Sequence, residues 1–346
     1  MFAPTLVGSA LELAAARAED AVALSIGRRT LTYGEVDAMS SALAFALEQR
    51  GVAPGDRVAT LLEGVESAIA FWAVEKAGAV GVPLDEHDAE ELAEVRRAVD
   101  ARALVVDAAV APTFHHAVAR APNLRAVIVR GRRADVDAAG SAVYVTYETA
   151  LAEEDPRSEP RVLRRIDLDD AWLELDEDGA WCALSHRVLL ARAASLAAGL
   201  DLAPDDVVSG APLSEVAVAC ALAGAVLRAP GGEAREHAGA GRVLWVGAAD
   251  EDSPEEDEPG VTAVHLHRST HGGPIAVLAA SNEPARVLPN VDVRIVDEEG
   301  AAVAPKVVGE IEVRSSGLAA VVAVEGGYFR TGEAGMLDDA GGLYVL

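Results

Sequence analysis

The sequence predicts an α/β protein in which stacked, mixed and largely parallel sheets are flanked by helices, with a small mainly-β section near the C-terminus. Three observations carry this prediction. Apolar strands alternate with amphipathic helices through the first two-thirds of the chain, which is the pattern of βαβ units. Beyond Arg228, short strand patterns replace the helical ones. The 346 residues are 51% hydrophobic, enough for a sizeable core.

The first part of the chain is a regular alternation of helices and strands. A helix is expected over residues 34–50, because apolar residues from Val36 to Leu47 recur at helical spacing and Gly51 follows them. The remaining elements are expected as strands over 57–62, 80–82, 103–106 and 125–129 and as helices over 66–77, 89–99, 114–119 and 186–199.

The last third contains mainly strand patterns, with strands expected over 242–246, 261–266, 275–279, 291–296 and 308–313. Residues 250–259 form an acidic run with two prolines, which predicts a solvated loop and not a site. The sequence therefore predicts an α/β part over 1–228, a shortened acidic linker region over 229–260 and a mainly-β part over 261–346.

The charge balance limits the classes of partner. The net charge is −27, and Lys76 and Lys306 are the only lysines. Because nucleic acids and anionic membranes bind through positive charge, neither is expected as a partner, whereas a basic protein would be attracted. Residues 1–10 contain no basic or long apolar segment, and no apolar run approaches a membrane span. We expect a cytoplasmic protein.

The cysteines and histidines do not form a metal-binding pattern. Cys182 and Cys220 are isolated in the sequence, so both are expected to be reduced thiols of the core. The adjacent histidines at 115 and 116 would face different directions on a helix. His267 and His271 lie four residues apart, but no neighbouring cysteine or carboxylate in the sequence completes a ligand set. No metal site is expected.

Short motifs occur in a fixed order along the chain. They are Leu31-Thr32-Tyr33-Gly34-Glu35-Val36, Gly51-Val52-Ala53-Pro54-Gly55-Asp56-Arg57-Val58-Ala59, Lys76-Ala77-Gly78-Ala79-Val80-Gly81-Val82-Pro83-Leu84-Asp85, Leu184-Ser185-His186-Arg187-Val188-Leu189-Leu190, Gly309-Glu310-Ile311-Glu312-Val313, Tyr328-Phe329-Arg330-Thr331-Gly332-Glu333 and Gly342-Leu343-Tyr344-Val345-Leu346. In this order they resemble the adenylate-forming superfamily of acyl-CoA synthetases, nonribosomal-peptide adenylation domains and firefly-type luciferases. The resemblance implies the fold of that superfamily's large N-terminal domain.

The resemblance also identifies a degenerate phosphate loop. In the superfamily, a Gly/Ser/Thr-rich loop ending in Pro-Lys-Gly holds the ATP phosphates. The corresponding residues here are Asp176, Glu177, Asp178 and Gly179, which follow Glu174 and include no lysine. Two like charges about 4 Å apart repel by about 4 kcal/mol at an effective dielectric constant near 20. We therefore expect this loop to repel triphosphate.

The nucleotide-binding residues that the resemblance implies are also altered. His267 stands where a tyrosine stacks on adenine, and Thr270 keeps the phosphate-contacting threonine. His271 replaces the glutamate that binds Mg²⁺ and is a poor substitute, because Mg²⁺ prefers oxygen ligands. Glu333 replaces the aspartate that binds the ribose hydroxyls and is longer by one methylene. A ribose contact and an exposed turn carboxylate are equally compatible with Glu333.

Two further positions are implied by the resemblance. Ser214 and Glu215 occupy the place of an aromatic-histidine pair beside the acyl group, and either a remodelled pocket or simple drift accounts for them. Ser185 and His186 match the start of the helix after the phosphate loop. Capping and packing explain these two residues better than catalysis, because a nucleophile and base need a third orienting group.

These departures favour a pseudoenzyme that has lost ATP-dependent carboxylate activation. The chain ends at Leu346, so the small C-terminal domain with its catalytic lysine is expected to be absent, and the region between Arg228 and Val261 is pared down. No cofactor is expected. The chain would act by binding a protein partner, such as a carrier protein or a related ligase, or an acyl or aryl small molecule. One alternative is an active half-enzyme that uses ATP or AMP and Mg²⁺ with a lysine domain from another chain; another is a purely structural assembly protein.

Overall fold

The protein is described by a computed structural model. It describes residues 5–26, 29–84, 100–109, 123–131, 142–152, 170–175, 181–210, 213–228, 241–248, 260–269, 271–278, 283–319 and 326–346. Several sequence predictions lie outside these residues: the helices over 89–99 and 114–119, the histidine pair at 115 and 116, the acidic run 250–259, the loop Asp176–Gly179, and Thr270.

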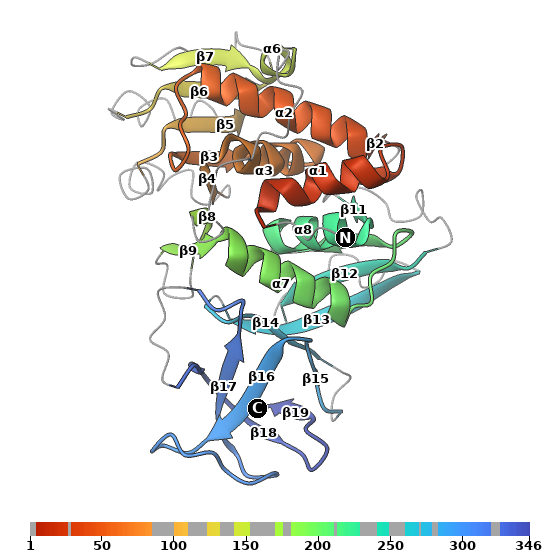
Figure 1. The fold of residues 1–346 in the computed structure, drawn as a ribbon, viewed down its shortest axis with the longest axis vertical. Coiled ribbons are helices and arrows are strands. Elements are labelled where there is room, and N and C mark those ends of the chain that lie inside the picture. The colour runs from red at the N-terminus through yellow and green to blue at the C-terminus, as the bar shows by residue number, and fades with distance from the viewer. Residues whose placement is uncertain are drawn as a thin grey trace.

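The described strands form three sheets, which follow one another down the long axis of the molecule (Figure 1). The uppermost has seven strands in the order β7-β6-β5-β3-β4-β8-β9, and only β8 and β9 pair antiparallel within it. Its strands are β3 (Arg57–Leu61), β4 (Val80–Pro83), β5 (Ala103–Asp107), β6 (Ala126–Arg130), β7 (Val143–Thr146), β8 (Asp170–Leu175) and β9 (Trp181–Ser185).

The second sheet has eight strands in the order β15-β14-β13-β12-β10-β11-β1-β2, parallel from β13 to β1 and antiparallel at both ends. Its strands are β1 (Val22–Ile26), β2 (Arg29–Thr32), β10 (Val207–Gly210), β11 (Val226–Arg228), β12 (Val243–Ala248), β13 (Val261–Ser269), β14 (Gly273–Val277) and β15 (Arg286–Val287). The third sheet is antiparallel and contains β16 (Val291–Val296), β17 (Gly309–Ser315), β18 (Phe329–Leu337) and β19 (Leu343–Val345).

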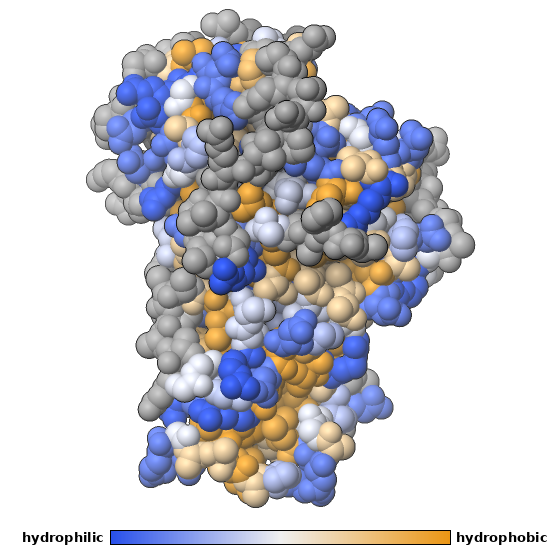
Figure 2. All heavy atoms as spheres, viewed as in Figure 1, coloured by the Kyte–Doolittle hydropathy of each residue, from blue (hydrophilic) through white to orange (hydrophobic). Residues whose placement is uncertain are grey.

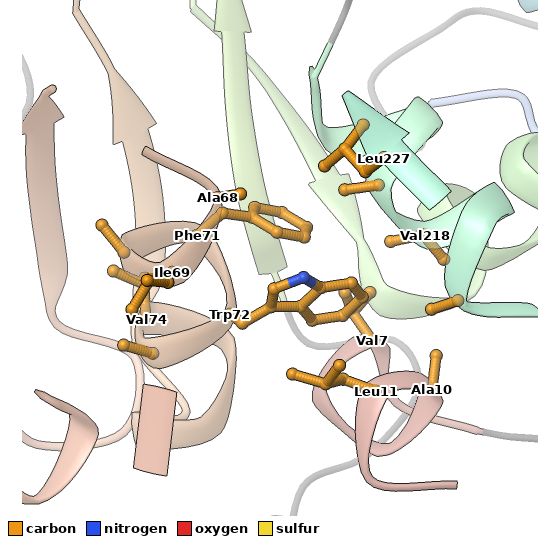
Figure 3. Packing of buried hydrophobic residues seen from close by; sticks show 14 of the residues in the cluster. Val7, Ala10, Leu11, Ala68, Ile69, Phe71, Trp72, Val74, Val218 and Leu227 are labelled. Atoms are coloured by element: carbon orange, nitrogen blue, oxygen red, sulfur yellow. The ribbon is translucent and has the colours of Figure 1, made fainter. Parts of the chain in front are cut away.

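Helices pack between the two larger sheets. They are α1 (Val7–Arg17), α2 (Tyr33–Gln49), α3 (Val65–Ala77), α7 (His186–Gly199) and α8 (Leu213–Ala223), with the short α6 (Tyr147–Leu151) beside β7. Eleven of the 13 residues of α3 are buried, so this helix has no solvent face. Figure 3 shows its Phe71 and Trp72 reaching Val7 and Leu11 of α1 and Val218 of α8. The main core therefore lies in the helical layer between the sheets.

Glycine is required at one point where this core meets the seven-stranded sheet. A Cβ atom at Gly81 on β4 would lie 1.9 Å from the indole of Trp172 on β8. Trp172 in turn packs edge-to-face on Phe71, with ring centroids 4.8 Å apart. The glycine of the Lys76-to-Asp85 motif thus makes room for a core tryptophan.

Helix α2 begins with a capping box. The hydroxyl of Thr32 accepts a hydrogen bond from the Glu35 backbone N–H, and the Glu35 carboxylate accepts one from the Thr32 N–H. We expect Thr32→Ala to lower the free energy of unfolding by about 1 kcal/mol, because the Glu35 backbone N–H loses its acceptor. Urea unfolding measures this loss, with Thr262→Ala on an exposed position of β13 as the control. An equal effect of the two substitutions would contradict the prediction.

The sheet boundaries do not coincide with the division predicted from sequence. Strand β12 lies in the expected linker region over 229–260, and its Leu244 and Val246 are buried. Strands β13 to β15, which fall in the expected mainly-β part, belong to the eight-stranded sheet. The separate sheet begins at β16 because the chain turns at Pro289 and Asn290, and Asn290 adopts a positive φ of 64°.

The third sheet is joined to the second by a hydrophobic cluster. Ile275 of β14 packs there with Ile295, Ile311 and Leu343, one residue from each of three strands of the third sheet. Figure 2 shows a hydrophobic band on this face where the two sheets meet.

Both cysteines are buried and form no disulfide, which confirms the prediction of reduced core thiols. Burial raises the pKa of the Cys220 thiol, so it stays protonated. Among the residues that the structure describes, no helix combines the length and apolar character needed to cross a bilayer.

Candidate functional site

The candidate site is organised around an arginine on the buried face of α7. Ser185 caps this helix by accepting a hydrogen bond from the Val188 N–H. Leu189, Arg192 and Leu196 then recur at helical spacing and are all buried. A guanidinium therefore stands on a stripe that is otherwise apolar, and Arg192 is only 1% exposed.

Two carboxylates neutralise this arginine from two other elements. Arg192 Nη1 lies 3.2 Å from Glu215 Oε1 on α8 and 3.5 Å from Glu174 Oε2 on β8. Arg268 on β13 approaches the same pair, with Nη2 3.5 Å from Glu215 and 4.0 Å from Glu174. The Ser214 hydroxyl donates to Glu174 Oε1 at 3.3 Å. We call Glu174, Arg192, Glu215 and Arg268 the ion-pair cluster.

The cluster carries no net charge when all four groups are ionised. Burial raises the pKa of Glu174, and the nearby Glu215 raises it further, while Arg192 and Arg268 oppose both effects. The two guanidinium groups thus offset part of the free-energy cost of burying the ionised Glu174 carboxylate. The cluster offers no surplus positive charge for a phosphate group.

Arg192 also connects α7 to the C-terminal third of the chain. Its Nε donates to the Gly317 carbonyl at 2.8 Å, and Nη2 donates to the His271 carbonyl at 3.0 Å. Gly273 adopts a φ of +74°, and a Cβ atom there would lie 2.6 Å from Arg192 Nε. The turn after β13 is therefore shaped around this guanidinium.

A histidine of β13 and a glutamate of β18 lie in contact with each other. His267 Nε2 on β13 lies 3.2 Å from Glu333 Oε2 on β18. The histidine is 4% exposed, whereas the Glu333 side chain is 43% exposed. Burial lowers the pKa of His267 to about 4, so its imidazole is neutral at pH 7. The pair at neutral pH is an uncharged ring next to a partly solvated carboxylate.

His271 lies in the turn that follows β13. Its Nδ1 is 3.5 Å from Cys182 Sγ on β9, and its ring packs against Phe329 with centroids 5.9 Å apart. Within the described part of the chain, no group of three or more His, Cys, Asp or Glu side chains is arranged to hold a metal ion.

Sequence comparison relates part of the chain to known enzymes. Residues 11–171 match the family model described as "AMP-binding enzyme". The chain is 41% identical over 106 residues to phosphinothricin tripeptide synthetase PhsC of Streptomyces viridochromogenes, covering 30% of this chain and 10% of that protein. It is 40% identical over 113 residues to a salicyl-AMP ligase / salicyl-S-ArCP synthetase of Mycobacterium tuberculosis, covering 30% and 20%. The matched segment spans a fifth or less of these relatives.

Structural comparison extends the likeness to the whole chain. A long-chain-fatty-acid-CoA ligase (FadD1) from Archaeoglobus fulgidus superimposes with a TM-score of 0.81 at 15% identity, covering 100% of this chain and 84% of that one. The N-terminal domain of FACL13 from M. tuberculosis gives a TM-score of 0.77 at 19% identity, covering 99% of both chains. Residues 11–171 therefore match the AMP-binding enzyme family, and the chain as a whole has the fold of adenylate-forming enzymes.

The fold is that of the superfamily's N-terminal domain, as the resemblance implied. Several residues that the resemblance assigned to the adenylate-forming site make contacts in two groups. His267 contacts Glu333, His271 contacts Arg192 through its carbonyl, and the adjacent Ser214 and Glu215 both engage the ion-pair cluster. The phosphate-loop residues 176–179 and Thr270 lie outside the described residues.

One residue of the acidic segment is placed differently from its predicted role. Glu174, counted among the four carboxylates of the adenylate-forming phosphate loop, lies within strand β8 and faces the interior. It is held by Ser214 and Arg192 because the strand continues to Leu175. Its charge is therefore compensated inside the protein, and it does not add to repulsion in the loop.

Sequence reasoning missed Arg192 and Arg268. The signal for Arg192 was its position on the apolar stripe of α7, between Leu189 and Leu196. Glu215 carried a similar signal, because it is the single charged residue of the otherwise apolar helix α8. Charged residues at such positions are rarely buried unless they are paired.

His186 and Ser185 have structural roles in this adenylate-forming fold. The Val7 N–H donates to His186 Nδ1 at 3.3 Å, and the buried Glu75 lies 3.4 Å from the same nitrogen. Ser185 caps α7. Capping and packing therefore account for both residues, in agreement with the prediction.

Proposed function

We propose that this chain is an adenylate-forming-superfamily pseudoenzyme that does not catalyse ATP-dependent carboxylate activation and acts by binding. The observation that carries the proposal is the ion-pair cluster. Glu215, at the position that the resemblance places beside the acyl group, is fully buried and neutralised by Arg192 and Arg268.

The ion-pair cluster affects the binding of both reactants, the substrate carboxylate and the ATP phosphates. A substrate carboxylate would find no surplus positive charge at the cluster, because Arg192 and Arg268 already pair with Glu174 and Glu215. Arg192 and Arg268 are each within 4.0 Å of these carboxylates, so neither is a surplus cation for a phosphate. Charge stabilisation of the transition state is usually the largest catalytic term, and these described residues provide little of it.

The proposed partner is a protein, such as a carrier protein or a related ligase, or else an acyl or aryl small molecule. The net charge of −27 favours a partner whose contact surface is basic. The proposed location is the cytoplasm, and no resident cofactor is proposed.

The test is ATP–pyrophosphate exchange by the purified chain. Acetate, octanoate, palmitate, salicylate and the common amino acids are supplied in turn with Mg·ATP. We expect exchange at the level of the protein-free blank with every acid, because the cluster provides no surplus positive charge for either the carboxylate or the triphosphate. Exchange above the blank with any acid would overturn the proposal.

A second candidate is a chain that retains an adenosine site, and the His267–Glu333 contact favours it. A half-enzyme of this kind would bind AMP and take its catalytic lysine from another chain. Calorimetric titration with AMP separates the two candidates, with Glu333→Ala as the variant and Glu310→Ala as a control on the same sheet. AMP binding by wild type and Glu310→Ala that is lost in Glu333→Ala would support the second candidate. If wild type gives no heat of AMP binding, the first candidate is supported.

A further inference from the structure

An open crevice of about 390 Å³ lies in the seven-stranded sheet, away from the ion-pair cluster. It is formed at the carboxyl ends of β3, β5 and β6, where Leu61, Asp107 and Arg130 are the last strand residues. Strand β4 separates these strands from β8, which carries Glu174. Figure 1 shows β6, β5 and β3 above β8 and β9 in the molecule.

The topology of the sheet places this crevice at a switch point. From β3 the chain crosses through α3 to β4 on one side, and the later strands β5, β6 and β7 add on the other side. At such a point the connections after neighbouring parallel strands lead to opposite sides of the sheet, and open α/β sheets bind ligands in the crevice formed there. The volume also falls within the range of small-molecule sites.

The crevice is held in a fixed shape by Asp107 and Arg130. These residues are register partners at the strand ends, and both nitrogens Nε and Nη2 of Arg130 donate to the Asp107 carboxylate. Asp107 and Arg130 both bind the backbone of Glu63. The Glu63 N–H donates to the Asp107 carboxylate at 3.4 Å, and the Glu63 carbonyl accepts from Arg130 at 3.1 Å. The loop after β3 is thereby tied to β5 and β6.

The described residues of the lining carry a net negative charge. Arg130 is the one cation among these described lining residues, and Glu66 also binds it, with Nη1 to Oε2 at 2.9 Å. Glu63, Asp107 and Glu148 supply three carboxylates against this one guanidinium. A guanidinium engaged by two carboxylates has little attraction left for an anion, whereas the exposed Glu63 and Glu148 can still attract a cation.

The remaining lining is apolar and small. Leu61 and Leu62 contribute hydrocarbon surface, and Ala108 and Ala109 leave space in front of it.

We propose that this crevice binds a small organic cation, namely an alkylammonium or arylalkylammonium compound. Its ammonium group faces the lining carboxylates, and its hydrocarbon part covers the leucines and alanines. This proposal concerns a site distinct from the ion-pair cluster and is independent of whether the chain binds nucleotide.

The first test is calorimetric titration of the full chain with hexylammonium chloride, hexanoate and hexanol, which share a hydrocarbon tail and differ in charge. We expect hexylammonium to bind with a Kd of about 1 mM, as suits a ligand of this size. Binding should weaken with added salt. Hexanoate should not bind detectably, and hexanol should bind more weakly than the amine.

Variants locate the binding in the crevice. Glu63→Gln and Glu148→Gln should each weaken hexylammonium binding by about two- to fivefold, the usual contribution of an exposed ion pair. Ala109→Phe should abolish it by filling the crevice. Glu298→Gln, in an exposed turn after β16, is the matched control and should leave the Kd unchanged.

Three results would overturn the proposal: no binding of hexylammonium at about 10 mM, tenfold above the expected Kd; equal binding of hexanoate; or equal binding by wild type and Ala109→Phe. Because Glu63, Glu148 and Ala109 are exposed, these variants should unfold at the same urea concentration as wild type. That measurement separates a loss of binding from a loss of folding.

Discussion

Replacing Arg192 by methionine is expected to lower the free energy of unfolding by about 3–5 kcal/mol, the usual cost of removing one partner from a buried ion pair. The substitution keeps the hydrocarbon length of the side chain but leaves Glu174 and Glu215 without their most buried counter-ion. It also removes the donors to the Gly317 and His271 carbonyls.

Urea unfolding of wild type and Arg192→Met measures this loss. Arg187→Ala is the control, because Arg187 is an exposed arginine on the same helix, and it should change stability little. The triple variant Arg192→Met, Glu174→Gln, Glu215→Gln removes the charges together and should recover part of the loss, since the uncompensated carboxylates are then neutral. A loss from Arg192→Met no larger than that from Arg187→Ala would show that the ion-pair cluster does not stabilise the fold.

The second large effect is a dependence of stability on pH that originates at His267. Burial lowers the pKa of this imidazole from 6.5 to about 4. The unfolded chain therefore binds a proton at His267 between these pH values, and the folded chain does not. Above pH 6.5 the protonation of His267 does not affect the free energy of unfolding. As the pH falls below 6.5, this protonation lowers the free energy of unfolding, by about 3 kcal/mol in total when pH 4 is reached.

The measurement is urea unfolding of wild type and His267→Asn over a series of pH values from 7.5 downward. Many carboxylates also titrate at low pH, so the informative quantity is the difference between the two proteins at each pH. That difference should be constant above pH 6.5 and should change in favour of the variant below it. A difference that stays constant down to pH 5 would show that His267 titrates normally.

The local pattern of the chain was sufficient to predict much of the fold. The helix expected over 186–199 and the strand expected over 291–296 are observed with those same limits. Both begin and end at local signals, since Ser185 caps the helix and strand alternation is set by neighbouring residues. The ordered motifs also predicted the superfamily, because each motif is a short segment that can be read without knowing its contacts.

The sites required contacts between segments far apart in the chain. Arg192 meets Glu174, Glu215 and the Gly317 carbonyl from three other segments, so its role cannot be read from the sequence around any one of them. Glu174 was assigned to a loop because its neighbours are acidic, and only the pairing of β8 with β9 shows that it belongs to a strand.

The sequence by itself predicted many of the secondary-structure elements and the adenylate-forming fold, because both depend on residues close together in the chain. The tertiary structure decided which charges are compensated and where space remains. The ion-pair cluster and the crevice at β3, β5 and β6 exist because sheet pairing brings distant strand ends together. Burial then sets the electrostatics of the groups found there.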